Sequence, residues 1–193
     1  MPVTRGFTEA DRSAVARLYW QAFGGKLGRV LGPDAKATGL LERSLDPAHA
    51  FCARDGDGRI IGVAGFQTHL GALTRDARSD FVAIYGPIGG RLRYFALGLL
   101  ARPTLAGIVI DGIAVAPDAR NRGVGTALLE AITREARTLG YEAIELEVAE
   151  HNARARALYA RRGFFPTTTH RARWAAPFFG YRSATRMVRR LVP

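Results

Sequence analysis

The sequence contains very little cysteine: Cys52 is the one cysteine among 193 residues. A single thiol cannot form an intramolecular disulfide, and it cannot build a zinc site that needs several cysteines. The four histidines, His49, His69, His151 and His170, show no metal-ligand spacing. We therefore expect no disulfide and no metal site, a reducing compartment, and Cys52 as a small core residue.

Long apolar runs are absent too. The first residues, MPVTRGFTEADRS, lack the apolar core of a signal peptide. The most apolar stretch, Tyr94 to Ile110, is interrupted by Arg102 and Pro103. It falls short of the roughly 18 apolar residues that span a bilayer. We expect one cytoplasmic domain over residues 1–193, with no membrane partner.

Acidic residues are few: the sequence has 17 Asp and Glu against 28 Lys and Arg, which gives a formal net charge of +11. A basic balance attracts anions such as nucleic acid or a phosphorylated cofactor. Arginines lie near aromatic residues around 154–162 and 171–190, so a basic nucleic-acid-binding module is one alternative. These arginines are spread over segments with other predicted roles, which weakens that alternative.

The hydrophobic pattern predicts an α/β fold. A helix is predicted after an N-cap at Thr8, a second over Asp34–Leu45, and a hairpin around the DGDG turn. Residues 69–106 are expected to be an irregular insertion, with a loop over 84–90 and a helix over 91–101. The pattern then predicts strands over 107–117 and 141–150 around an amphipathic helix over 123–140, followed by a helix over 152–163 and strands over 164–169 and 183–191.

The turn before the long helix, RNRGVG, contains two glycines, Gly123 and Gly125, which do not stabilise a helix. Glycine inside a helix costs about 1 kcal/mol relative to alanine. One explanation is that Gly123 and Gly125 let backbone N–H groups approach a phosphate, with Arg120 and Arg122 adding charge. The other is that the glycines permit tight packing of the helix on its strand. The turn alone leaves both open.

Two common nucleotide-binding motifs are incomplete here. The third glycine of G-x-G-x-x-G is replaced by Leu128, which disfavours a dinucleotide-binding oxidoreductase. A Walker A loop needs Gly-Lys-Ser/Thr, and this triplet does not occur.

The segment AVAPDARNRGVGTALLEAI, with R-x-x-G-x-G from Arg120 to Gly125, resembles the acetyl-CoA-binding motif of the GNAT N-acetyltransferase superfamily. Downstream, NARARALYARRGF is similar to the second signature of that family. The resemblance is close over residues 108–165 and looser over 4–67. It implies a mixed, mostly antiparallel central sheet flanked by helices, with a splay between two central parallel strands.

The resemblance also implies how acetyl-CoA binds as co-substrate. Backbone N–H groups of the turn would hold the pyrophosphate, and a backbone N–H of the strand would polarise the thioester carbonyl. An amine would attack the thioester directly. The cofactor residues implied are Ile113, Ala114, Val115, Arg120, Arg122, Gly123, Val124, Gly125, Thr126, Asn152, Ala155 and Tyr159.

Tyr159 is the candidate acid that would protonate the departing thiolate. Asn152 and Tyr159 are seven residues apart, so they share one face of a short helix. Asn152 would contact the cofactor arm and Tyr159 would reach the sulfur. The competing interpretation is that Tyr159 packs beside Leu158.

Asp111 is the candidate base that would accept the proton of the amine. The two-residue period of a strand puts it on one face with Val109, Ile113 and Val115. Glu145 and Glu147 on the next strand are alternatives, and structural pairing with an arginine remains open for all three.

The most concrete function is an N-acetyltransferase that acts on a primary amine, either a small molecule or a peptide. An acyl-CoA-binding GNAT fold without catalysis is the alternative. The segment 170–182 is expected to pack on the surface, and the alternative is that it lines the acceptor pocket or acts as a lid. The helix over 91–101 would cover the acceptor side or support a homodimer.

Overall fold

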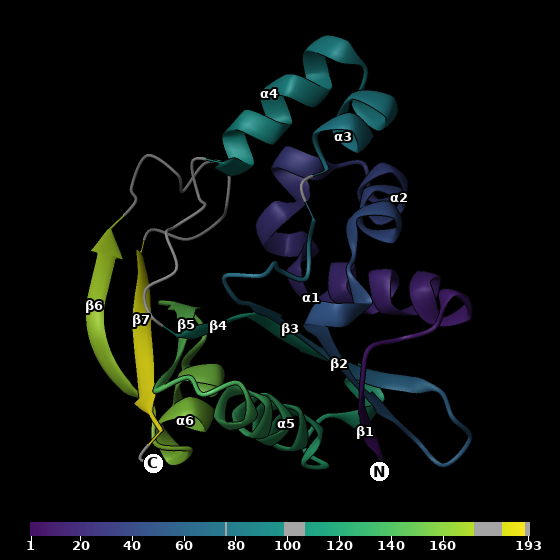
Figure 1. The fold of residues 1–193 in the computed structure, drawn as a ribbon. Helices are drawn as coiled ribbons and strands as arrows, with labels where there is room; N and C mark the ends of the chain where they lie inside the picture. Colours follow the sequence, from purple (N-terminus) through teal and green to yellow (C-terminus); the bar gives the residue numbers. More distant parts are fainter. Residues whose placement is uncertain (76, 99–106, 172–182, 192–193) are drawn as a thin grey trace.

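A seven-stranded sheet forms the centre of the computed structural model, which describes residues 1–75, 77–98, 107–171 and 183–191 (Figure 1). The strands are β1 (Val3–Arg5), β2 (Ala50–Arg54), β3 (Ile60–Gln67), β4 (Ile108–Val115), β5 (Ala143–Ala149), β6 (Phe165–Arg171) and β7 (Ser183–Arg190). Their spatial order is β1-β2-β3-β4-β5-β7-β6, and all neighbours are antiparallel except β4 and β5. The predicted mixed, mostly antiparallel sheet is confirmed.

The parallel pair separates soon after it begins. The register pairs Ile108 with Ile144, Val109 with Glu145, and Ile110 with Leu146. Beyond Ile110 and Leu146, the described parts of β4 and β5 are not paired with each other, which is the splay that the family resemblance implies.

Helices cover both faces of the sheet. They are α1 (Arg12–Leu31), α2 (Asp34–Ser44), α3 (Arg78–Tyr85), α4 (Pro87–Gly98), α5 (Val124–Thr138) and α6 (Ala153–Arg161), with short 3-10 helices at Glu9–Asp11, Pro47–His49 and Pro117–Ala119. α5 and α6 lie on one side of the sheet, and α1 to α4 lie on the other (Figure 1).

Two glycines mark the opposite faces of the sheet. A Cβ at Gly62 of β3 would lie 2.7 Å from Cγ1 of Val124 in α5. A Cβ at Gly112 of β4 would lie 2.3 Å from Cζ of Phe23 in α1. Because Gly62 pairs with Val115, three residues from Gly112, the two glycines point to opposite faces.

Local signals explain where the helices that build the site begin. The N–H of Thr8 donates to Oδ2 of Asp11 at 2.9 Å, so Thr8 caps the 3-10 helix Glu9–Asp11, from which α1 continues at Arg12. In α5, Val124, Leu128, Ile132 and Ala136 are buried at intervals of four residues, as a helix with one apolar face requires.

The loop predicted over 84–90 is wrong. α3 continues to Tyr85, Gly86 turns the chain with φ of 79°, and α4 begins at Pro87, where proline is well tolerated. A Cβ at Gly90 would lie 2.4 Å from the carbonyl oxygen of Phe81, so this glycine permits close packing of α4 on α3. Residues 99–101 of the predicted helix, and 172–182 of the segment 170–182, lie outside the described residues.

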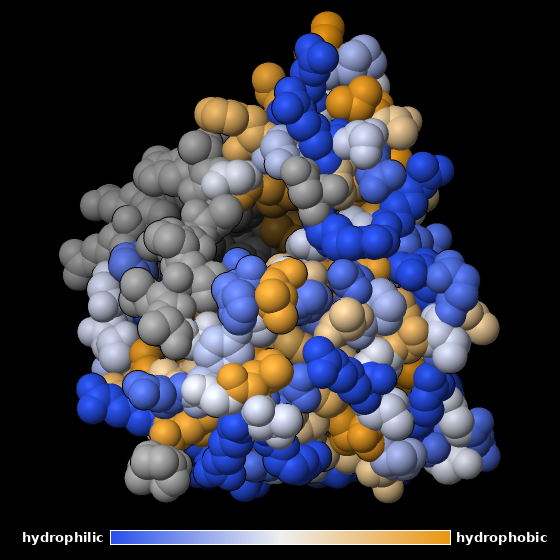
Figure 2. Space-filling view, viewed as in Figure 1, coloured by the Kyte–Doolittle hydropathy of each residue, from blue (hydrophilic) through white to orange (hydrophobic). Residues whose placement is uncertain are grey.

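Hydrophobic side chains are exposed on α4, at the end of the molecule farthest from the termini (Figures 1 and 2). Ile88, Leu92 and Phe95 are 81%, 72% and 67% exposed. The homodimer expected at this helix stays a prediction. None of the helices in the described part of the chain is long and apolar enough to cross a membrane.

Candidate active site

A cavity of about 550 Å³ opens beside the splayed end of β4 and the N-terminus of α5. Its walls come from α1, β4, the turn before α5, and α6. The structure brings together on this cavity ten of the twelve cofactor residues that the family resemblance implies: Ile113, Val115, Arg120, Gly123, Val124, Gly125, Thr126, Asn152, Ala155 and Tyr159.

The other two lie elsewhere. The Ala114 side chain is buried and pairs across the sheet with Val63, so a ligand in the cavity would not meet it. Arg122 is exposed at the turn but is not among the described residues that line the cavity.

The first turn of α5 presents backbone N–H groups without helical partners. The N–H of Ala127 donates to the carbonyl of Gly123 at 3.0 Å, and the amides of Val124, Gly125 and Thr126 precede this first helical bond. Gly123 has a φ of 80°, which favours glycine. The helix dipole and these amides together favour an anion at this point.

Packing does not explain Gly125. A Cβ there would make ordinary contacts, 3.8 Å from Leu158 and 3.9 Å from Val115. The glycine that allows α5 to approach the sheet closely is Gly62 of β3. The bare backbone at Gly125 therefore faces the cavity without a structural need, which favours the phosphate explanation over the packing explanation.

Arginines give the cavity a positive charge. Arg120, Arg154 and Arg161 line it, and its described lining residues include no aspartate or glutamate. Arg120 donates from Nε to the carbonyl of Val115 at 3.3 Å, and Arg154 donates to the side chain of Asn121. Such a lining suits a phosphate-bearing ligand.

Arg154 and Arg161 were predicted as part of a basic surface and not as cavity residues. Together with Leu158 they occupy one face of α6 at spacings of four and three residues. This spacing is the signal that could have placed them beside Asn152, whose Oδ1 caps α6 by accepting the Ala155 N–H at 3.1 Å.

Tyr159 is buried in α6 and lines the cavity. Its ring packs on Phe164 with centroids 5.7 Å apart, and its carbonyl accepts the Phe164 N–H at 3.0 Å. Burial raises the pKa of the Tyr159 hydroxyl to about 12, so it holds its proton at neutral pH. Tyr159 thus packs against its neighbours, as the competing interpretation holds, and also faces the cavity.

The prediction that Asp111 shares a face of β4 with Ile113 and Val115 is wrong. Gly65 pairs with Gly112 and Phe66 with Ile110, so Asp111 is the extra residue of a β-bulge. The bulge interrupts the two-residue period. As a result Asp111 does not share a face with Ile113 and Val115.

The surroundings of Asp111 belong to the α1 side of the sheet. The N–H of Leu73 donates to its Oδ2 at 3.3 Å. The Asp111 side chain is exposed by its accessible surface, yet desolvation by the protein around it raises the pKa of the carboxyl to about 6. Burial and the nearby charge of Asp111 also raise the pKa of Tyr19 in α1.

The two alternative bases differ in their environment. Glu145 is buried and its Oε2 lies 2.6 Å from Nη2 of Arg186 on β7, which is the structural pairing left open from the sequence. Glu147 is exposed and pairs in register with Arg186. In the described residues, no group of three or more histidines, cysteines or acids could hold a metal ion.

Helix α1 contributes a part of the cavity that the sequence did not indicate. Gln21, Ala22 and Phe23 line it from the side opposite α6. In the sequence, Phe23 is one apolar residue of the predicted helix after Thr8, with no sign of a link to this cavity. Its contact with β4 joins residues about ninety positions apart, which no local pattern reveals.

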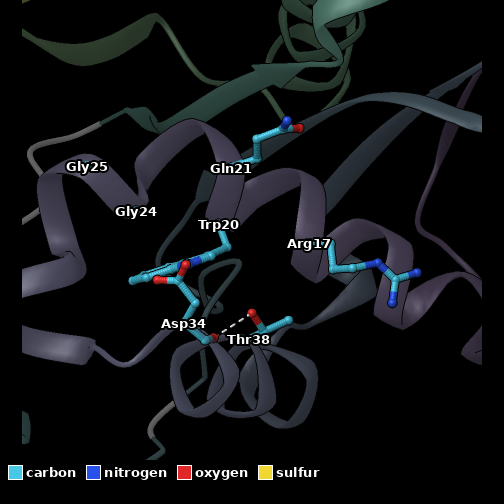
Figure 3. Close-up of a pocket in the computed structure, with 7 residues that line it drawn as sticks. All are labelled: Arg17, Trp20, Gln21, Gly24, Gly25, Asp34 and Thr38. Carbon is cyan, nitrogen blue, oxygen red and sulfur yellow. Dashed lines mark hydrogen bonds between the residues drawn. The ribbon is translucent and has the colours of Figure 1, made fainter.

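A second cavity, of about 490 Å³, lies between α1 and α2 (Figure 3). Trp20, Asp34 and Thr38 gather on its α2 side, while Gln21, which also lines the first cavity, points away from them. None of the predicted site residues lies here, so the first cavity is the candidate active site.

Known proteins share this architecture. A solved acetyltransferase of Corynebacterium glutamicum, described as histone acetyltransferase HPA2 and related acetyltransferase, is 27% identical with a TM-score of 0.69, over 99% of this chain and 97% of that one. The ribosomal-protein-S18-alanine N-acetyltransferase of Escherichia coli, 20% identical with a TM-score of 0.58 over 100% and 94% of the two chains, shares the fold. The fold is that of solved acetyltransferases.

The chain belongs to the acetyltransferase (GNAT) family, whose model matches residues 12–164. A ribosomal protein bS18-alanine N-acetyltransferase of Salmonella typhimurium is 39% identical over 89 residues, 41% of this chain and 60% of that protein. The mycothiol acetyltransferase of Beutenbergia cavernae is 43% identical over 58 residues, 30% of this chain and 20% of that protein. Both alignments span less than two thirds of the relative.

Proposed function

We propose that the protein transfers an acetyl group from acetyl-CoA to a primary amine by direct attack of the amine. The observation that carries this proposal is the bare backbone of Gly125 on a cavity lined by arginines, at the start of α5. Membership of the GNAT family supports the same conclusion.

Acetyl-CoA, when bound, supplies the acetyl thioester. The amides of Val124, Gly125 and Thr126 would bind its pyrophosphate, with Arg120, Arg154 and Arg161 adding charge. The backbone of β4 around Ile113 to Val115 would polarise the thioester carbonyl. Asn152 and Ala155 would contact the cofactor arm from α6.

Two groups would move protons. Tyr159 holds its hydroxyl proton at neutral pH and would donate it to the departing sulfur. Asp111 would accept a proton from the amine on the α1 side of β4, directly or through water. Their placement on different sides of the splayed strand suits a base that meets the acceptor and an acid that meets the cofactor.

The acceptor is a small-molecule or peptide amine. One relative is named as acetylating an alanine of ribosomal protein bS18, and the other is named as a mycothiol acetyltransferase. These acceptors are those of the two relatives and not of this chain. A panel of amines and peptides incubated with acetyl-CoA, with mass detection of acetylated products, tests the proposal. Acetyl-CoA binding without turnover of any amine would favour the non-catalytic alternative.

A further inference from the structure

The ring of Phe23 packs against the backbone of β4 at Gly112. A Cβ at Gly112 would lie 2.3 Å from Cζ of the Phe23 ring and 2.9 Å from Cε2. No space therefore remains between the tip of the ring and β4 at Gly112. Phe23 also lines the candidate active-site cavity, so the ring forms its wall at this position.

The ring is held in place by its neighbour in α1. The Tyr19 ring is buried and its centroid lies 4.5 Å from that of Phe23. Tyr19 in turn lies near enough to Asp111 for the Asp111 charge to raise the Tyr19 pKa. Phe23 thus occupies the side of the cavity that adjoins the proposed base.

Gly112 directly precedes Ile113, where the β4 segment proposed to polarise the thioester carbonyl begins. A group carried on that carbonyl is therefore close to the wall that Phe23 builds. An acetyl group adds one methyl beyond the carbonyl, whereas longer acyl groups add further methylenes. A rigid aromatic wall rejects extra methylenes because a packed ring cannot shift without losing its contacts.

We propose that Phe23 determines the acyl length that the protein accepts, admitting acetyl-CoA and excluding longer acyl-CoA molecules such as butyryl-CoA. This inference rests on the proposed function. It makes Phe23 a specificity-determining residue that acts by occupying space beside Gly112.

Equilibrium binding of acetyl-CoA, butyryl-CoA and free coenzyme A to the full chain tests the inference without any amine. The wild-type protein should bind butyryl-CoA at least about 10-fold more weakly than acetyl-CoA, the lower end of what a pocket gains by rejecting methylenes. Phe23→Ala should remove most of this about 10-fold difference, because the added methylenes no longer meet the ring. Phe95→Ala, an exposed aromatic on α4, is the matched control and should keep the wild-type ratio.

Phe23→Leu is the second variant, because it retains packing on Tyr19 while shortening the wall, and its ratio should fall between those of the wild type and Phe23→Ala. Equal binding of both acyl-CoA molecules by the wild type overturns the inference. An unchanged ratio in Phe23→Ala or, where that variant does not fold, in Phe23→Leu overturns it too. Failure of the proposed function is recognised separately: free coenzyme A would not bind to the wild type, or acetyl-CoA would bind and no amine of the panel would be acetylated.

Discussion

The N–H of Leu73 donates a hydrogen bond to Oδ2 of Asp111, with 3.3 Å between the two atoms. This bond favours the ionised carboxyl, yet the effect of burial is larger and the pKa of Asp111 rises to about 6. If Asp111 accepts the amine proton, it does so only when ionised. Turnover should therefore rise with pH through about 6, and Asp111→Asn should lower turnover and remove this limb of the pH profile.

The pH profiles of Glu145→Gln and Glu147→Gln provide the comparison. Both should retain the limb near pH 6. Loss of the limb in Glu147→Gln, with its survival in Asp111→Asn, would transfer the role of base to Glu147.

The raised pKa of Asp111 also has a consequence for stability. The folded protein holds this proton more tightly than the unfolded chain, so stability falls as pH rises from the unfolded pKa, near 3.8, to about 6. The asparagine side chain of Asp111→Asn cannot ionise, so this variant does not lose stability over that pH range. Its Tm should exceed the wild-type Tm at pH 8 by more than it does at pH 4, and an equal difference at both values would contradict the assigned shift.

Tyr159→Phe removes the proposed acid and keeps the ring that packs on Phe164. Turnover should fall by about 100-fold, at the lower end of what a general acid contributes, because the thiolate would depart without its proton. The dissociation constant of acetyl-CoA should change little. Tyr141→Phe, which removes a hydroxyl bonded to His69 instead, is the control, and equal turnover in both variants would exclude Tyr159 from the chemistry.

Gly125→Ala separates the two explanations of the glycine turn. The added Cβ meets only ordinary contacts, so the helix should gain up to about 1 kcal/mol from alanine, while binding of acetyl-CoA weakens. Gly39→Ala in α2, where the added Cβ meets no atom within 4 Å, should gain similar stability without affecting binding. Calorimetry and denaturant unfolding measure both quantities, and unchanged binding in Gly125→Ala would contradict a phosphate at this turn.

The part of the site that the sequence predicts well is built from local structure. A helix N-terminus with two glycines exposes amides wherever it folds. Helical spacing puts Asn152 and Tyr159 on one face of α6, the family resemblance implies these two and Ala155 as cofactor residues, and all three line one cavity. These residues needed no knowledge of distant contacts.

The parts that were missed depend on tertiary pairing. The β-bulge at Asp111 exists because of its register with β3, and the two-residue period cannot reveal it. Phe23 meets Gly112 only after α1 packs on the sheet. Gly86 and Gly90 carry a loop signal in the sequence, but Gly90 instead permits α3 and α4 to pack closely.

The central claim is that the cavity at the start of α5 binds acetyl-CoA, and thermal unfolding with ligands tests it most directly. A ligand that binds only the folded protein at 100 times its dissociation constant adds about 2.7 kcal/mol of stability. Acetyl-CoA and coenzyme A should therefore raise the Tm measurably, and NAD should not. A Tm that responds to neither acetyl-CoA nor coenzyme A would contradict the account.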